Sequence, residues 1–140
     1  MQALTPIENE LVEEFALFDD WMDKYDHIIS LGHELPPMDP AWKTDVFLIH
    51  GCQSRVWLKT FEEDGKLLLQ ADADALIAKG IVAMLVRIYS GQPAAWVAAS
   101  AENPAFIHSI GLREHLSPTR SNGLNAMLKR IQQEAQRMAQ

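Results

Sequence analysis

The sequence predicts an α+β fold in which a small, largely antiparallel three-stranded sheet packs against helices that cover one of its faces. Segments with the apolar periodicity of helices lie toward both ends of the chain, and short β-prone runs lie between them, in residues 46–70. The dipeptide Asp64-Gly65, a signal for a tight turn, joins two of these runs. At 140 residues and 48% hydrophobic, the chain has the size of one globular domain, so we expect a single domain over residues 1–140.

Two helices and a connector are predicted first. The run Thr5-Pro6-Ile7-Glu8 supplies a capping threonine, a proline at the first helical position and a glutamate three residues after the cap. Asp19 or Asp20 caps a second helix, and Gly32 is expected to end that helix in the left-handed conformation. Three prolines lie within Glu34–Pro40, so this segment is predicted to be an irregular connector.

The sheet and the later helices follow. The three β-prone runs are Val46–Ile49, Val56–Thr60 and Lys66–Gln70. After them, Asp72 and Asp74 are interpreted as a capping pair for a long central helix that ends at Gly91. Three further helices, each with a proline at its start, are predicted over Pro93–Ser100, over Pro104–Ile110 and, after the cap Ser117, from Pro118 onward.

Charge and composition exclude several classes of function. A net charge of −7, with acidic and basic residues interspersed, argues against binding to nucleic acid or to an anionic membrane surface. The N-terminal segment has neither a basic region nor an apolar run, and no apolar stretch approaches the roughly 20 residues of a membrane span. We therefore expect a cytoplasmic protein. The single cysteine excludes an internal disulfide and a CxxC motif.

That cysteine, Cys52, is the main candidate for chemistry. It follows Gly51, which allows a tight turn, and it lies between two β-prone runs among polar neighbours. Lone cysteines are often small buried hydrophobic residues, whereas this setting favours a reactive thiol, and the residues alone leave both interpretations open. Arg55 or a protonated His50 close to the sulfur would lower its pKa and raise the thiolate fraction.

Two other sites have weaker support. A cysteine hydrolase needs a histidine beside its nucleophile, and the chain has five, at positions 27, 33, 50, 108 and 115, but none has a spacing that identifies it as a partner of Cys52. A metal site would have to recruit Cys52, His50, Asp72 and Asp74, which match no recognisable ligand spacing. We predict neither a metal site nor a cofactor.

Four blocks of the chain closely resemble the SufE/CsdE family of sulfur acceptor proteins. The most specific is Gly51–Leu58, GCQSRVWL, which is similar to the family signature GC-x-S-x-VWL. The other three blocks, in family order, are WMDKY and IISLG with the following Leu35-Pro36, DADA with Lys79-Gly80, and LSPTRSNGL at residues 116–124. Ala73 stands where the family usually has serine, so no role is given to a hydroxyl group at that position.

The resemblance implies a SufE/IscU-like fold and a function in iron–sulfur cluster assembly. In this family a pyridoxal-phosphate cysteine desulfurase holds sulfur as a persulfide, and the acceptor's cysteine, here Cys52, takes that sulfur and passes it to a scaffold. The pyridoxal phosphate belongs to the partner. The resemblance assigns support of the cysteine loop to Gln53, Ser54 and Asp74. It assigns docking or thiolate stabilisation to Arg120, whose structural alternative is a residue of the first helical turn paired with Glu114. Gly51 is the expected hinge of the cysteine loop, because glycine allows backbone conformations that other residues resist.

Three other functions are alternatives to sulfur carriage. A docking module would stimulate the desulfurase without carrying sulfur, and a cysteine hydrolase would act without a partner. A cluster-assembling scaffold is disfavoured, because it needs several cysteine ligands where this chain has one. The motifs are shared by SufE-like and CsdE-like proteins, so the sequence selects neither a particular desulfurase (SufS-like or CsdA-like) nor a particular scaffold. Because a persulfide exposed to solvent is lost to other thiols, we expect Cys52 to be shielded until a partner docks.

Overall fold

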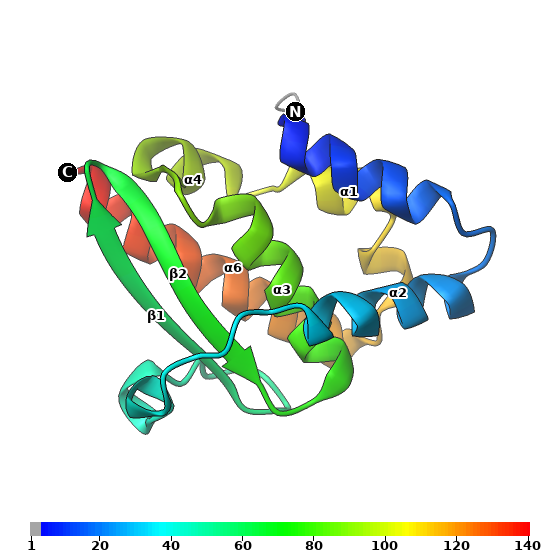
Figure 1. Cartoon of the computed structure of the whole chain (residues 1–140), viewed down its shortest axis with the longest axis horizontal. Coiled ribbons are helices and arrows are strands. Elements are labelled where there is room, and N and C mark those ends of the chain that lie inside the picture. Colours follow the sequence, from blue (N-terminus) through cyan, green and yellow to red (C-terminus); the bar gives the residue numbers. More distant parts are fainter. Residues whose placement is uncertain (1–3) are drawn as a thin grey trace.

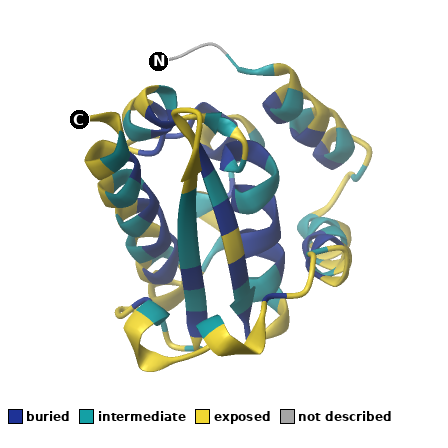
Figure 2. Ribbon diagram, turned by 60° about the vertical axis from the view of Figure 1, so that its left-hand side comes forward, coloured by how far each residue is buried: buried dark blue, intermediate teal, exposed yellow. Residues whose placement is uncertain are grey.

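A computed structural model describes residues 4–140 and has the predicted α+β class (Figure 1). The helices are α1 (Pro6–Ala16), α2 (Trp21–His33), α3 (Leu76–Tyr89), α4 (Ala94–Ser100), α5 (Ala105–Ile110) and α6 (Pro118–Ala139). The strands are β1 (Val56–Glu63), β2 (Lys66–Ala73) and β3 (Gln92–Pro93), and three 3₁₀ turns are η1 (Pro40–Trp42), η2 (Asp45–Phe47) and η3 (Arg113–His115). The sheet is antiparallel in the order β1-β2-β3, and α3 and α6 lie along the β1–β2 hairpin (Figures 1 and 2).

The N-terminal helices begin where the sequence predicts. The Thr5 hydroxyl accepts a hydrogen bond from the Glu8 N–H at 3.2 Å, and the Glu8 carboxylate accepts one from the Thr5 N–H at 3.1 Å. This reciprocal pair is a capping box. Asp20 caps α2 by accepting from the Asp23 N–H at 2.9 Å.

Gly32 has a different role from the predicted one. The helix α2 continues through Gly32 to His33, and Glu34 ends it in the right-handed conformation. A Cβ atom at Gly32 would lie 2.9 Å from the Gly80 nitrogen, and one at Gly80 would lie 2.1 Å from the Ile28 carbonyl oxygen. The two glycines therefore let the backbones of α2 and α3 touch, which no larger residue would allow.

The prediction of a strand over Val46–Ile49 is wrong. Residues 45–47 form the turn η2, and the segment pairs with β1 only through an isolated bridge from Leu48 to Trp57. The third strand is instead β3, two residues long, which pairs with the start of β2. The hairpin itself is confirmed: Asp64 and Gly65 have φ values of +53° and +77°, which suit a two-residue turn.

The segment of residues 39–47, here called the strap, lies on the outer face of the hairpin, opposite the helices. The ammonium group of Lys59, on that face of β1, lies 5.0–5.3 Å from the ring centres of Trp42, Phe47 and Phe61. Such cation–π contacts are attractive, because the faces of aromatic rings carry partial negative charge. Side-chain packing on the outer face therefore replaces the backbone pairing that the apolar run had suggested. The strap leads directly into the loop that carries Cys52.

The later helices are mostly as predicted, with one correction. Gly111, at φ +70°, ends α5, and the Ser117 hydroxyl caps α6 by accepting from the Arg120 N–H at 3.2 Å. The interpretation of Asp72 and Asp74 as helix caps is wrong, because the cap position of α3 is Ala75 and no side chain bonds to its first turn. Both carboxylates are used elsewhere, as described below.

The close contact between α2 and α3 gives a stability prediction. The substitution Gly80→Ala should lower the free energy of unfolding by about 3 kcal/mol or more, the upper end of overpacking costs, because its methyl group would meet the backbone of α2. Urea denaturation measures this loss. Gly123→Ala in α6 is the matched control: its methyl group would make only ordinary contacts, the shortest 3.6 Å, and alanine favours a helix by about 1 kcal/mol. Equal losses at both positions would contradict the packing argument.

Candidate functional site

Cys52 lies in a six-residue loop, residues 50–55, with a fixed base. The Ile49 N–H donates to the Val56 carbonyl oxygen at 2.8 Å, and this bond closes the loop. Gly51 has a φ of +97°, which favours glycine, and a Cβ atom there would lie 3.3 Å from the Ala126 Cβ in α6. The loop therefore turns tightly against α6 just before the cysteine.

The sulfur atom of Cys52 lies against α6. The residue is half-buried, and its thiol donates a long hydrogen bond, 3.6 Å, to the Gly123 carbonyl oxygen. A Cβ atom at Gly123 would lie 3.6 Å from the sulfur, an ordinary contact distance, so the thiol packs closely against this turn of α6. Sequence reasoning did not single out Gly123 as a site residue. A glycine inside a predicted helix is the signal that points to it, because it destabilises a helix and so indicates a close approach by another group.

Burial raises the pKa of the Cys52 thiol above its ordinary value. The expectation that Arg55 or His50 would lower this pKa is wrong, since both residues are exposed and neither gives the sulfur a compensating charge. A hydrogen bond donated by the S–H group also requires the protonated form. At rest the thiol is therefore neutral at pH 7, and the thiolate is the minor form.

Two carboxylates at the end of β2 hold the segment that carries the cysteine. Asp74 accepts a hydrogen bond from the Arg55 N–H at 2.9 Å, and the Asp74 N–H donates to the Arg55 carbonyl oxygen at 3.1 Å. Asp72 forms ion pairs with Lys43 of the strap and, at 3.4 Å, with Lys79 of α3. Burial alone would raise the pKa of Asp72, but hydrogen bonds from Lys43 and from the Ala73 N–H outweigh it and lower that pKa.

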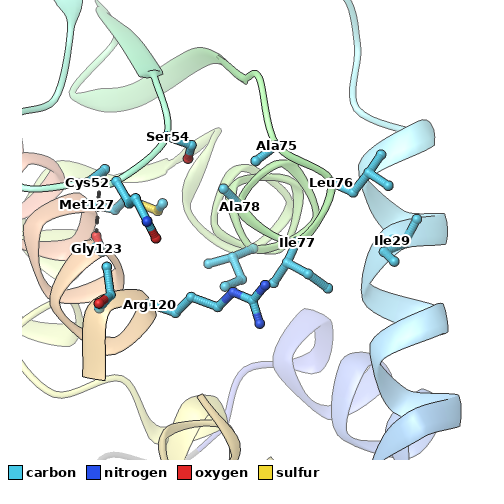
Figure 3. Close-up of a pocket in the computed structure, with 13 residues that line it drawn as sticks. Ile29, Cys52, Ser54, Ala75, Leu76, Ile77, Ala78, Arg120, Gly123 and Met127 are labelled. Atoms are coloured by element: carbon cyan, nitrogen blue, oxygen red, sulfur yellow. Dashed lines mark hydrogen bonds between the residues drawn. The ribbon is translucent and has the colours of Figure 1, made fainter. Parts of the chain in front are cut away.

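A cavity of about 490 Å³ opens beside the thiol (Figure 3). Its walls come from α2, the cysteine loop, the start of α3 and the first turns of α6, and they are mostly apolar. Ile29 and Leu76 form one side, and the Arg120 side chain extends from α6 toward α3 on another (Figure 3). Within residues 4–140, Arg120 is the one charged side chain in this lining.

The structure brings most of the predicted site residues together. Cys52, Gln53, Ser54 and Arg120 all line the cavity. Gly51 lies behind the loop against α6, and Asp74 holds the far end of the loop, so it lies outside the cavity.

The alternatives that use histidine or metal find little support. Among the described residues, the hydrogen bond that Cys52 makes goes to Gly123 and not to a histidine. His27 pairs with Glu14 at 3.0 Å, and the His115 ring stacks on Trp21 at 4.1 Å between centroids. In residues 4–140, no three His, Cys, Asp or Glu side chains come together in a way that could hold a metal ion. No helix in that part of the chain is both long enough and apolar enough to cross a bilayer.

Comparison with known proteins finds one family. The SufE family model, described as "Fe-S metabolism associated domain", matches residues 9–135. A SufE-like protein of Rhizobium etli is 40% identical over 131 residues, which cover 91% of this chain and 88% of that protein. One of Rhizobium meliloti is 38% identical over 132 residues, 91% of this chain and 94% of that protein.

Two proteins with lower sequence identity are also similar to this chain. SufE-like protein 1 of Arabidopsis thaliana, named as chloroplastic/mitochondrial, is 35% identical over 136 residues. These cover 96% of this chain but 36% of the plant protein. A solution structure of a hypothetical protein from Thermus thermophilus superposes with a TM-score of 0.78 at 22% identity, covering 97% of this chain and 98% of that one. This likeness concerns the fold alone, and it agrees with the predicted α+β class.

The raised pKa of Cys52 predicts a slow, strongly pH-dependent reaction with iodoacetamide. In the native protein the apparent pKa of alkylation should lie above that of the same thiol in the urea-denatured chain, which is the internal control. Because the folded state then holds the thiol proton more tightly, the free energy of unfolding should fall as pH rises above the unfolded-state pKa. A native apparent pKa below the denatured one would contradict this picture.

The Asp74–Arg55 bond predicts that Asp74 keeps the loop closed. The substitution Asp74→Ala should speed alkylation of Cys52 by about fivefold at fixed pH, since one hydrogen bond contributes roughly 1 kcal/mol to the closed state. Glu102→Ala, which removes an exposed carboxylate from the turn between α4 and α5, is the charge-matched control. Equal rates in both variants would show that the bond does not restrain the loop.

Proposed function

The chain belongs to the SufE family, whose domain is associated with Fe-S metabolism, and from this premise we propose that its Cys52 carries sulfur. In the proposal, Cys52 takes sulfur from the persulfide of a pyridoxal-phosphate cysteine desulfurase, raises the turnover of that enzyme and passes the sulfur to an iron–sulfur scaffold. The observation that carries the proposal is the placement of the one thiol of the chain, half-buried in a short loop beside an apolar cavity.

The transfer needs only sulfur chemistry. The Cys52 sulfur attacks the outer sulfur of the partner's persulfide, a new S–S bond forms at Cys52, and the S–S bond on the partner breaks. The proton of the Cys52 thiol ends on the partner's departing sulfur, so the step is balanced without an oxidant, a reductant or a metal. A resting thiol that is neutral supplies that proton, which is consistent with the raised pKa of Cys52.

We propose that the loop opens when the partner docks. The same burial that shields the thiol also limits its thiolate fraction, so a reaction at useful rates requires the sulfur to leave its contact with Gly123. Gly51 is the hinge in this proposal, because its positive φ allows backbone rotations that other residues resist. Gln53 and Ser54 move with the cysteine, and Asp74 holds the closed state.

Arg120 is proposed as a docking or thiolate-stabilising residue. Its guanidinium group extends along the cavity that Cys52 lines, where a permanent positive charge would favour an anionic sulfur (Figure 3). No ion pair forms between Arg120 and Glu114 among the described residues, although such a pair is the simplest structural role for an arginine at that position.

Two other functions have weaker support than sulfur carriage. A docking-only activator remains the second candidate, because an apolar cavity edge suits a partner whether or not sulfur is transferred. A cysteine hydrolase is disfavoured by the Cys52 hydrogen bond, which goes to a carbonyl oxygen where a hydrolase needs a base.

We place the protein in a reducing compartment such as the cytoplasm, because its one thiol is free and must stay reduced between transfers.

Sulfur carriage is tested by intact-protein mass spectrometry. Wild type mixed with a cysteine desulfurase and L-cysteine, without reductant, should gain one or more sulfur masses of about 32 Da, and dithiothreitol should remove them. Cys52→Ser is the matched control and should gain none, because an alcohol forms no persulfide. Stimulation of the desulfurase by both proteins without any added mass would favour the docking-only function. Absence of both effects would overturn the proposal.

A further inference from the structure

Four large hydrophobic side chains are strongly exposed in the described part of the chain, and one of them lies at the cavity of Cys52. Leu17, Met22 and Val46, with 79%, 75% and 75% of their surface exposed, do not line this cavity. Leu76, 59% exposed, is the first residue of α3 and forms part of the cavity wall. A single exposed leucine is ordinary on a protein surface, so the location of Leu76 matters more than its exposure.

The start of α3 is built in a way that stability does not explain. Helices commonly begin with a polar residue that accepts a hydrogen bond from the first turn, and losing such a cap costs about 1 kcal/mol. Here the cap position is Ala75, which makes no such bond, and Leu76 and Ile77 follow it. Ala75 and Leu76 are exposed and Ile77 is half-buried, so the chain presents apolar surface where a polar cap would stabilise the helix.

The apolar surface continues across the cavity mouth. The half-buried side chain of Ile29 extends from α2 on the same side as Leu76, and the Gly32–Gly80 contact fixes the distance between their two helices (Figure 3). On another side lies the positive charge of Arg120. The opening thus combines an apolar side with a cationic one, and Cys52 lines the same cavity.

We propose that Leu76 is an apolar anchor for the sulfur-donating protein, which packs an aliphatic or aromatic side chain against Leu76 and Ile29. This inference rests on the proposed function, because a donor must bring its sulfur to Cys52 and so must contact the residues around it. The charge of the opening fits the same occupant: the sulfur that departs from the donor's persulfide gains negative charge during the transfer, and Arg120 is a cation. The donor segment therefore carries an apolar side chain close to its reacting sulfur.

The test measures binding separately from sulfur transfer. All binding variants are made in the Cys52→Ser background, so that no covalent product forms, and the dissociation constant of their complex with the cysteine desulfurase is measured by calorimetry. Leu76→Ala should weaken binding by at least about fivefold, the loss typical of an interface anchor, and Leu76→Asp should weaken it further. Leu76→Met, which keeps an apolar side chain, should bind within about twofold of the parent.

Matched controls come from the other exposed hydrophobic residues. Leu17→Ala and Val46→Ala remove comparable exposed side chains away from the cavity, and they should leave the dissociation constant unchanged. Because Leu76 is exposed, its variants should also keep the unfolding midpoint of the parent, and urea denaturation checks this.

The outcomes separate this inference from the proposed function. Parent-like binding of Leu76→Ala and Leu76→Asp would overturn the anchor even if wild type gains sulfur at Cys52. Weakened binding of these variants, with no sulfur on wild type, would support the anchor and overturn sulfur carriage. Equal weakening by Leu17→Ala would also overturn the anchor, since the effect would not be local. Absence of any complex with the parent would overturn the anchor, whereas sulfur carriage is decided by the sulfur mass on wild type.

Discussion

The position of Cys52 depends on two carboxylates two residues apart at the end of β2. Asp72 holds the strap through Lys43, and Asp74 holds the far end of the cysteine loop through the backbone of Arg55. The 13 residues from Lys43 to Arg55 are therefore tied at both ends to one short stretch of the hairpin. Since Asp72 also pairs with Lys79, the same stretch fixes the start of α3 and thus one wall of the cavity. The helices α2 and α6 supply the remaining walls of the cavity.

The setting of the thiol favours a resting state over a reactive one. Burial and the contact with Gly123 both stabilise the neutral form, and at rest no cation among residues 4–140 outweighs them. A stand-alone enzyme with a cysteine nucleophile lowers the pKa of its thiol, whereas this protein raises it. In the proposed function, reactivity comes from a change of environment, which a partner protein provides by drawing the loop away from α6.

Much of the fold could be predicted from local sequence signals, and the failures have physical reasons. The caps at Thr5, Asp20 and Ser117 and the Asp64-Gly65 turn are local interactions, so the sequence reveals them directly. The role of Gly32 differs from the prediction because a glycine suits both a helix end and a close helix contact, and only the neighbouring helix decides between them. The run Val46–Ile49 has strand propensity, but the aromatic face of β1 offers it packing in place of pairing.

The functional site, like the fold, has features that local sequence predicts and features that depend on distant segments. Cys52 and the residues beside it follow from the motif, but the raised pKa depends on burial by α6, which lies 71 residues away in sequence at Gly123. The aspartates were predicted as helix caps because a carboxylate before a helix usually has that role. Here their partners are the strap and the loop, which sequence order does not place beside β2.

The closed base of the cysteine loop also limits how far the sulfur can travel. With Ile49 and Val56 held together, Cys52 is three residues from one anchor and four from the other, so the extended backbone reaches about 10 Å from the base. If Cys52 carries sulfur as proposed, so short a tether cannot span two active sites at once. Donor and receiver would then use the same face of the protein in turn and exclude each other, and excess of either one should inhibit sulfur delivery by occupying the carrier.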